Sequence, residues 1–292
     1  MKMNPNQRLK ASKNAQRVFK GSIIMMLLIV VIGLAFSCMG AQEQMAIDAT
    51  DVELIQYKVP DDDTPVVIFE TTKGTMKAVL FEDEAPNFCK YFINLVESGY
   101  YDDTYYFMIE TDQKAYAFGG AKAPNGEDTD DTDKKNLEPE TSKDLWPFRG
   151  ALCSYGREKG VFNKRNVTGS RIVFVNSVEF TDEFKAEMEA IEDANELILN
   201  AFFDNGGVPN FSQQFTLFGQ IYDGLDVLDA IHCVEVDDDM KPLEEVKIIK
   251  ATMSTYGEHK LENEEEFFKE SFKKEETDSQ TDNSSATDSS ES

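Results

Sequence analysis

The sequence predicts a mainly β domain that lies between an N-terminal membrane segment and a disordered acidic tail. Alternating apolar residues with glycine-containing turns fill the middle of the chain, and a long uncharged apolar run precedes them. Residues 258–292 are instead rich in Glu, Lys, Ser, Thr and Asp. With 292 residues, of which 41% are hydrophobic, the chain is long enough for one or two domains with a sizeable core.

The first 41 residues are typical of a segment that directs a protein to the membrane. Residues 1–20 hold six basic residues and no acidic one, and Ile23–Phe36 has no polar side chain. At 1.5 Å per residue, roughly 20 helical residues span the hydrocarbon core of a bilayer. Because basic flanks stay in the cytoplasm, we expect the body of the protein on the extracytoplasmic face of the cell membrane.

Two interpretations of residues 21–41 remain open. One is an uncleaved signal anchor. The other is a lipoprotein signal in which Cys38, after Leu34–Ser37, is the acylated residue, since these residues resemble a bacterial lipobox. Either interpretation tethers the body to the membrane, through the apolar segment or through acylated Cys38.

Residues 42–64 are predicted to form a polar stalk, and residues 65–257 the folded domain. Its first elements are two strands, Val66–Glu70 and Thr75–Phe81, joined by a turn at Lys73-Gly74. A helix over Ala85–Glu97 follows, with Pro86 in its first turn and Gly99 after its end.

The second half of the domain alternates strands with one long helix. Apolar residues at helical spacing predict a single helix over Thr181–Phe203. Strands are predicted on either side of it, over Arg171–Val175, Phe215–Ile221 and Val246–Ala251. In the tail, Phe267, Phe268 and Phe272 belong either to a short docking helix or to a frayed, partly helical segment.

Composition argues against several classes of function. The net charge of −26 argues against nucleic acid as a partner, because a phosphate backbone needs a basic face. The four cysteines form no C-x-x-C pair, so no disulfide framework is expected. The two histidines stand apart, which argues against zinc and against a histidine-based triad. We expect neither a metal nor a cofactor.

Eleven short pieces, spread over about residues 65–253, resemble the cyclophilins in order and in spacing. They are Glu70–Lys77, Leu80-Phe81, Ala85-Pro86, Phe92–Asp102, Gly119-Gly120, Arg149–Leu152, Gly169-Ser170, Gly206–Pro209, Thr216–Ile221, Gly224–Leu228 and Lys241–Ile248. The resemblance implies a closed eight-stranded antiparallel barrel capped by two helices, with an extra helix inserted in residues 176–205. It also implies peptidyl-prolyl cis-trans isomerase (rotamase) activity on proline-containing or unfolded polypeptide segments.

The sequence departs from the family where the chemistry occurs. In cyclophilins an arginine donates hydrogen bonds around the prolyl amide, and that position falls on Met108, which cannot donate one. The glutamine before the glycine pair becomes Phe118, and the histidine of the last strand becomes Phe215. The substrate groove implied by the resemblance consists of Phe107, Met108, Tyr116, Phe118, Tyr155, Arg171, Val173, Phe211 and Phe215.

Arg171 is the one arginine of this predicted groove. It either substitutes in part for the missing catalytic arginine, binds a carbonyl of the substrate, or serves only to pair with an acid or to reach solvent. Two functions therefore stay open: a membrane-tethered isomerase of weak activity that assists the folding of exported proteins, and a non-catalytic peptide- or protein-binding module, a pseudoenzyme. A purely structural role is a third reading.

Overall fold

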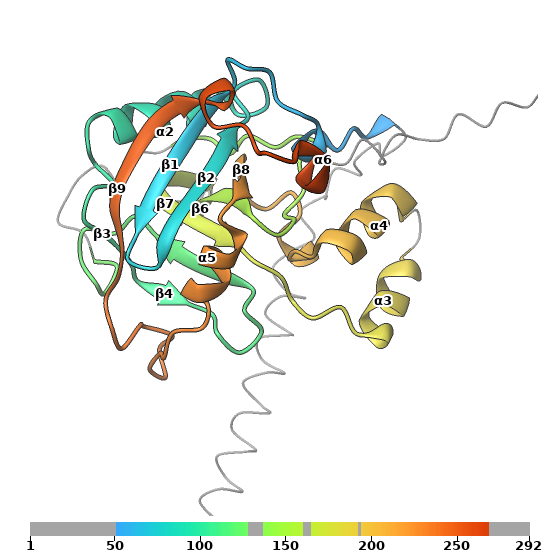
Figure 1. Ribbon diagram of the computed structural model, residues 1–292. Coiled ribbons are helices and arrows are strands. Elements are labelled where there is room, and N and C mark those ends of the chain that lie inside the picture. Colours follow the sequence, from blue (N-terminus) through green and yellow to red (C-terminus); the bar gives the residue numbers. More distant parts are fainter. Residues whose placement is uncertain (1–50, 128–136, 160–164, 192–193, 269–292) are drawn as a thin grey trace, which may run out of the picture. The chain divides into compact units, whose positions relative to one another are not determined.

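The described part of the chain is built on one nine-stranded antiparallel sheet that curves into a barrel (Figure 1). The computed structural model describes residues 51–127, 137–159, 165–191 and 194–268. In sheet order the strands are β3 (Thr104–Tyr106), β9 (Val246–Thr255), β1 (Pro65–Thr71), β2 (Gly74–Leu80), β8 (Leu217–Asp223), β6 (Ala151–Lys159), β7 (Arg165–Val175), β5 (Tyr116–Gly119) and β4 (Met108–Ile109).

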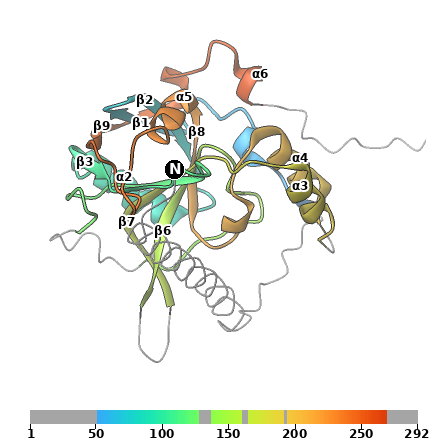
Figure 2. The same ribbon diagram turned by 90° about the horizontal axis from the view of Figure 1, so that it is seen from below.

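The two ends of this sheet meet at Phe107. Strands β3 and β4 are separated by that residue alone; β3 pairs with β9, and β4 pairs with β5. A further bridge joins Tyr105 to Ala121, just after β5. Counted as one strand interrupted at Phe107, β3 and β4 complete the eight-stranded closed barrel that the resemblance implies. Figure 2 shows the β6–β7 hairpin extending from this barrel.

Aromatic side chains fill the barrel and join it to its two capping helices. The ring of Phe69 lies 5.5 Å from that of Phe174, and Phe218 lies 4.8 Å from Phe92 of α2 (Pro86–Glu97). Leu228, from α5 (Leu225–Ile231), belongs to the same buried cluster. Figure 1 shows α2 and α5 at opposite ends of the barrel, as the resemblance implies.

Helix α2 begins and ends where the sequence predicts, but its N-terminal cap comes from a distant loop. Ala85 precedes the helix and makes no side-chain cap. The Glu140 carboxylate instead accepts hydrogen bonds from the backbone N–H groups of Asn87 at 3.1 Å and Phe88 at 2.9 Å. At the other end Gly99, with φ +70°, takes the left-handed conformation that ends many helices.

The inserted segment contains two helices where one was predicted. They are α3 (Asp182–Glu189) and α4 (Glu196–Asn205). The Asn195 side chain accepts a hydrogen bond from the N–H of Ile198, so the chain starts a new helix there although the apolar spacing continues across the break. Helical spacing over Thr181–Phe203 would place Ile191 on the same buried face as Met188, but Ile191 follows the end of α3 and is 60% exposed.

Residues 51–58 do not form the expected stalk, because their apolar side chains pack against Phe148 and the inserted helices α3 and α4. Residues 51–58, the N-terminal strap, contain the short helix η2 (Ile55–Tyr57) and bury Tyr57 against Phe148. Gln56 is fully buried and donates to the carbonyl of Trp146 at 2.9 Å and to Oε1 of Gln220 at 2.7 Å. The folded part thus starts earlier than residue 65.

The first part of the predicted tail is also folded. Residues 256–268, the C-terminal arm, contain η5 (Tyr256–Glu258) and α6 (Glu264–Phe267). Phe268 is 2% exposed and packs on the rings of Tyr222 and Tyr256, while Phe267 lies 5.9 Å from Tyr57 of the strap. Phe267 and Phe268 therefore dock at the end of a short helix, whereas Phe272 and the rest of the tail, residues 269–292, lie outside the described residues.

The predicted membrane segment, residues 21–41, likewise lies outside the described ranges. Within those ranges the structure contains no helix of the length and apolarity that crossing a bilayer requires.

We expect Glu140→Ala to lower the free energy of unfolding by about 1 kcal/mol, because the first turn of α2 then loses both its acceptor and its negative charge. Urea denaturation followed by circular dichroism measures the change. Glu244→Ala, which removes an exposed carboxylate elsewhere, is the matched control and should leave stability unchanged. Equal stability of the two variants would contradict the capping role of Glu140.

Candidate functional site

Four neighbouring strands bring one row of side chains to the outside of the barrel. The register places Met108 of β4 opposite Phe118 of β5, Phe118 opposite Val173 of β7, and Val173 opposite Cys153 of β6. Their sequence neighbours Ala117 and Phe174 point into the barrel core, and side chains alternate along a strand. The row therefore faces outward, and the predicted positions of Met108 and Phe118 meet in it.

Five aromatic rings form a continuous series beside this row. We call them the aromatic strip: in order, Phe107, Phe118, Tyr116, Phe211 and Phe215. Successive ring centroids lie 5.9, 5.3, 5.4 and 5.1 Å apart. Phe211 comes from the short helix η4 (Pro209–Phe211). A sixth ring, Tyr155, is 40% exposed and lies 5.0 Å from Phe118. Apart from Arg171, the predicted groove residues are thus brought together on one face.

Arg171 belongs to the same strand as Val173, but its guanidinium is directed at the chain itself. The side chain is 3% exposed, and its NH1 group donates to the Gly120 carbonyl while NH2 donates to the Gly126 carbonyl, both at 3.1 Å. The guanidinium also lies 5.5 Å from the centre of the Phe107 ring. These contacts are with carbonyls of the protein itself, and the roles expected for Arg171 toward a substrate or an acid stay predictions.

The loop that Arg171 holds requires glycine at both carbonyls. Gly120 and Gly126 have φ +86° and +76°, a region that L side chains rarely adopt. A Cβ atom on Gly126 would lie 2.5 Å from the Phe107 ring. Arg171, the loop and Phe107 are therefore packed as one unit at the end of the strip.

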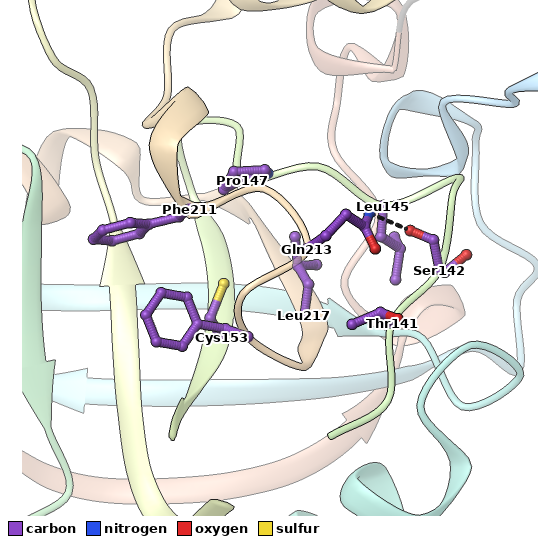
Figure 3. Close-up of a pocket in the computed structure, with 9 residues that line it drawn as sticks. Thr141, Ser142, Leu145, Pro147, Cys153, Phe211, Gln213 and Leu217 are labelled. Carbon is purple, nitrogen blue, oxygen red and sulfur yellow. Dashed lines mark hydrogen bonds between the residues drawn. The ribbon is translucent and has the colours of Figure 1, made fainter. Parts of the chain in front are cut away.

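A small pocket is lined in part by Phe211 and Phe215, the last two rings of the strip. Figure 3 shows Phe211 in its wall. It has room for about one water molecule. Gln213 closes one wall by donating to the Ser142 carbonyl at 2.8 Å. Sequence reasoning missed this pocket because the segment 141–147 carries no motif. The lining residues are Thr141, Ser142, Leu145, Pro147, Cys153, Phe211, Gln213, Phe215 and Leu217.

Two ionisable groups on this face, Tyr116 and Cys153, are poorly suited to proton transfer near neutral pH. Burial, with a smaller contribution from the Glu110 carboxylate, raises the pKa of Tyr116. Burial likewise raises the pKa of the Cys153 thiol far above its usual range. Within the described ranges, no group of three or more His, Cys, Asp or Glu side chains could hold a metal ion. The strip presents aromatic faces and edges, which suit packing against apolar groups.

Comparison with known proteins assigns the family. Residues 66–253 match the family "Cyclophilin type peptidyl-prolyl cis-trans isomerase/CLD". The chain is a cyclophilin. The matched residues run from β1 to β9, so the family match covers the whole barrel.

Relatives of this cyclophilin come from bacteria. It is 28% identical over 208 residues to a Staphylococcus haemolyticus protein named "Putative peptidyl-prolyl cis-trans isomerase", covering 68% of this chain and 96% of that one. It is 29% identical over 216 residues to a Streptococcus pyogenes protein named "Putative bifunctional phosphatase/peptidyl-prolyl cis-trans isomerase". The match covers 71% of this chain but only 43% of that longer protein.

Solved structures similar to this cyclophilin include a cyclophilin type peptidyl-prolyl cis-trans isomerase of Cryptosporidium parvum. The TM-score is 0.47 at 22% sequence identity, with 66% of this chain and 98% of that chain covered. A second structure of the same protein, determined in the presence of the dipeptide Ala-Pro, matches with a TM-score of 0.45 at 22% identity, with 65% and 99% covered.

We expect Arg171→Met to lower the free energy of unfolding by about 2 kcal/mol, because the buried Gly120 carbonyl and the partly buried Gly126 carbonyl lose a charged donor. Urea denaturation measures the loss. Lys241→Met is the control, because the contact of Lys241 with Asp239 is exposed and stabilises little. Arg171→Met with the stability of the wild type would show that the carbonyl contacts are dispensable and that the guanidinium is available to a substrate.

Proposed function

We propose that this protein is a membrane-tethered cyclophilin that holds X-Pro segments of exported polypeptides on its aromatic strip and isomerises them only weakly. The observation that carries the proposal is the pair formed by Met108 and Phe118. They face each other at the two positions where the family resemblance places an arginine and a glutamine. Neither side chain can donate a hydrogen bond.

The weakness of the proposed catalysis follows from what the reaction needs. Rotation about an X-Pro bond has a barrier of about 18–20 kcal/mol, because amide resonance must be broken. A catalyst has to bind the twisted amide better than either planar form. The thioether of Met108 gives no such preference, and the donors of Arg171 at 3.1 Å are directed at Gly120 and Gly126. Loss of one such donor costs about 10²–10³ in rate in comparable sites.

A non-catalytic binding module is the second candidate, and the lack of a donor at Met108 and Phe118 favours it. Tyr155 is 40% exposed beside Phe118, so an apolar contact surface persists where the donors are missing. The two candidates share the binding step and differ only in whether the bound X-Pro bond is turned over. Measurement of exchange and of binding on the same sample therefore separates them.

The tether and the location rest on the N-terminal sequence. Six basic residues in residues 1–20 followed by the apolar run Ile23–Phe36 support a membrane segment with the barrel on the extracytoplasmic side. A domain held there meets polypeptides as they leave the membrane. This supports a role in the folding of exported proteins.

We expect the full-length protein in detergent micelles to accelerate cis/trans exchange of an Ala-Pro peptide less than about tenfold. The double variant Met108→Arg, Phe118→Gln should raise this rate at least tenfold, because a donor then faces the prolyl amide. NMR exchange spectroscopy measures both rates. Leu243→Arg, which adds the same charge at an exposed loop, is the control and should change nothing. Wild-type exchange about 100-fold above background would contradict weak catalysis and indicate a different donor.

We expect the native protein to stay in the membrane pellet after an alkaline carbonate wash. Labelling with a clickable palmitate analogue then separates the two forms of tether, because only a lipoprotein loses the label in Cys38→Ser. Cys233→Ser, which alters an exposed thiol of the barrel, is the control. Recovery of the wild type in the soluble fraction would be evidence against any tether.

A further inference from the structure

We propose that the aromatic strip recognises a polyproline II segment with prolines one turn apart, in place of a single X-Pro bond. This inference rests on the proposed function, because it names the substrate class of the same site. The strip is a series of five rings, whereas one proline ring covers only one or two of them.

The spacing of the rings suits a polyproline II helix. Phe118, Tyr116 and Phe211 follow one another at 5.3 and 5.4 Å. A polyproline II helix advances about 3.1 Å per residue, so its repeat of three residues is roughly 9 Å. The two steps together set an upper limit on the distance from Phe118 to Phe211, and this limit is close to one turn of the ligand. A second pair of steps, from Tyr116 through Phe211 to Phe215, extends the strip further.

The rings of the strip are inclined to one another and do not form a flat stack. The planes of Tyr116 and Phe118 are inclined at 70°, those of Tyr116 and Phe211 at 44°, and those of Phe211 and Phe215 at 77°. Two neighbouring pairs thus meet edge to face, as aromatic pairs prefer. Pro-rich segments dock into aromatic-lined grooves of this kind because their extended helix is formed before binding.

The missing donors favour the same ligand. Met108, Phe118 and Phe215 cannot satisfy a peptide carbonyl that turns toward the strip, and burial of an unpaired polar group costs free energy. A polyproline II backbone avoids this cost, because its carbonyls remain solvated while its rings contact the surface. The hydroxyl groups of Tyr116 and the exposed Tyr155 can still donate to carbonyls at the edge of the strip.

The charges on and around the strip narrow the class of peptide that it can bind. The Glu110 carboxylate beside Tyr116 already accepts from the backbone N–H groups of Gln113 at 3.1 Å and Ala115 at 3.0 Å. Arg171 is buried and bonded to the loop below Phe107. The strip itself is therefore uncharged, while the whole chain carries −26 and repels acidic segments. The expected partner is a proline-rich segment that is uncharged or basic.

The test compares twelve-residue peptides of Ala, Pro and one terminal Lys, titrated into the full-length protein in detergent micelles. One peptide has prolines at positions i and i+3, one has a single proline, and one has prolines at positions i and i+2, which lie on different faces of the helix. We expect the first to bind at least about tenfold more tightly than the other two, because only it places both rings on the same face of the helix. Chemical-shift changes in NMR spectra of the protein, followed through each titration, give the dissociation constants.

The outcomes separate this inference from the proposed function. Equal binding of all three peptides would overturn polyproline recognition and leave an X-Pro site in place. Binding of none would overturn both. Replacement of the terminal Lys by Glu should weaken the first peptide, and tighter binding of the Glu peptide would contradict the charge argument.

A substitution at the far end of the strip locates the second proline. We expect Phe211→Ala to remove the advantage of the two-proline peptide while single-proline binding near Phe118 persists. Leu243→Ala, an exposed apolar residue outside the strip, is the control and should leave all affinities unchanged. If Phe211→Ala keeps the tenfold advantage, the second proline does not sit on the strip. Circular dichroism confirms that each variant is folded.

Discussion

Closure of the barrel at Phe107 is the constraint on which the binding face depends. Strand β3 must pair with β9, and β4, one residue later, must pair with β5. Because side chains alternate along a paired strand, this register decides that Met108 lies outside, opposite Phe118 and next to Val173. A slip of one residue would turn Met108 into the core and expose Ile109. The chemistry of the face is thus fixed by strand pairing before any ligand is present.

Local patterns predicted the elements whose signals are contiguous in the chain. The hairpin at Lys73-Gly74 and the helix over Ala85–Glu97 depend on alternation, on helical spacing and on glycine or proline at their ends, and the structure confirms them within a residue or two. The single helix over Thr181–Phe203 was wrong because apolar spacing says nothing about a competing cap, and Asn195 supplies one. The strap escaped prediction since the partners of Gln56, Trp146 and Gln220, are 90 and 164 residues away.

The candidate site was predictable as a set of positions but only partly as an arrangement. The resemblance located Met108 and Phe118, and the strand register brings them face to face. The direction of the Arg171 side chain could not be inferred, because a long side chain at the edge of a groove can reach either the ligand or the protein. In the structure the Arg171 side chain turns toward the protein, because it donates to two carbonyls of the loop, at Gly120 and Gly126. No short motif encodes that loop.

The contact between the N-terminal strap and the C-terminal arm has a mechanical consequence. Tyr57 and Phe267 lie 5.9 Å apart, so the chain segments that lead into and out of the barrel are fastened to the same region. A force applied at residue 51 reaches the strap before it reaches β1. The buried hydrogen bonds of Gln56 would then have to break first. A pull on the chain before residue 51 therefore unfolds the strap before it reaches β1. The strap protects the barrel and its binding face from such a force.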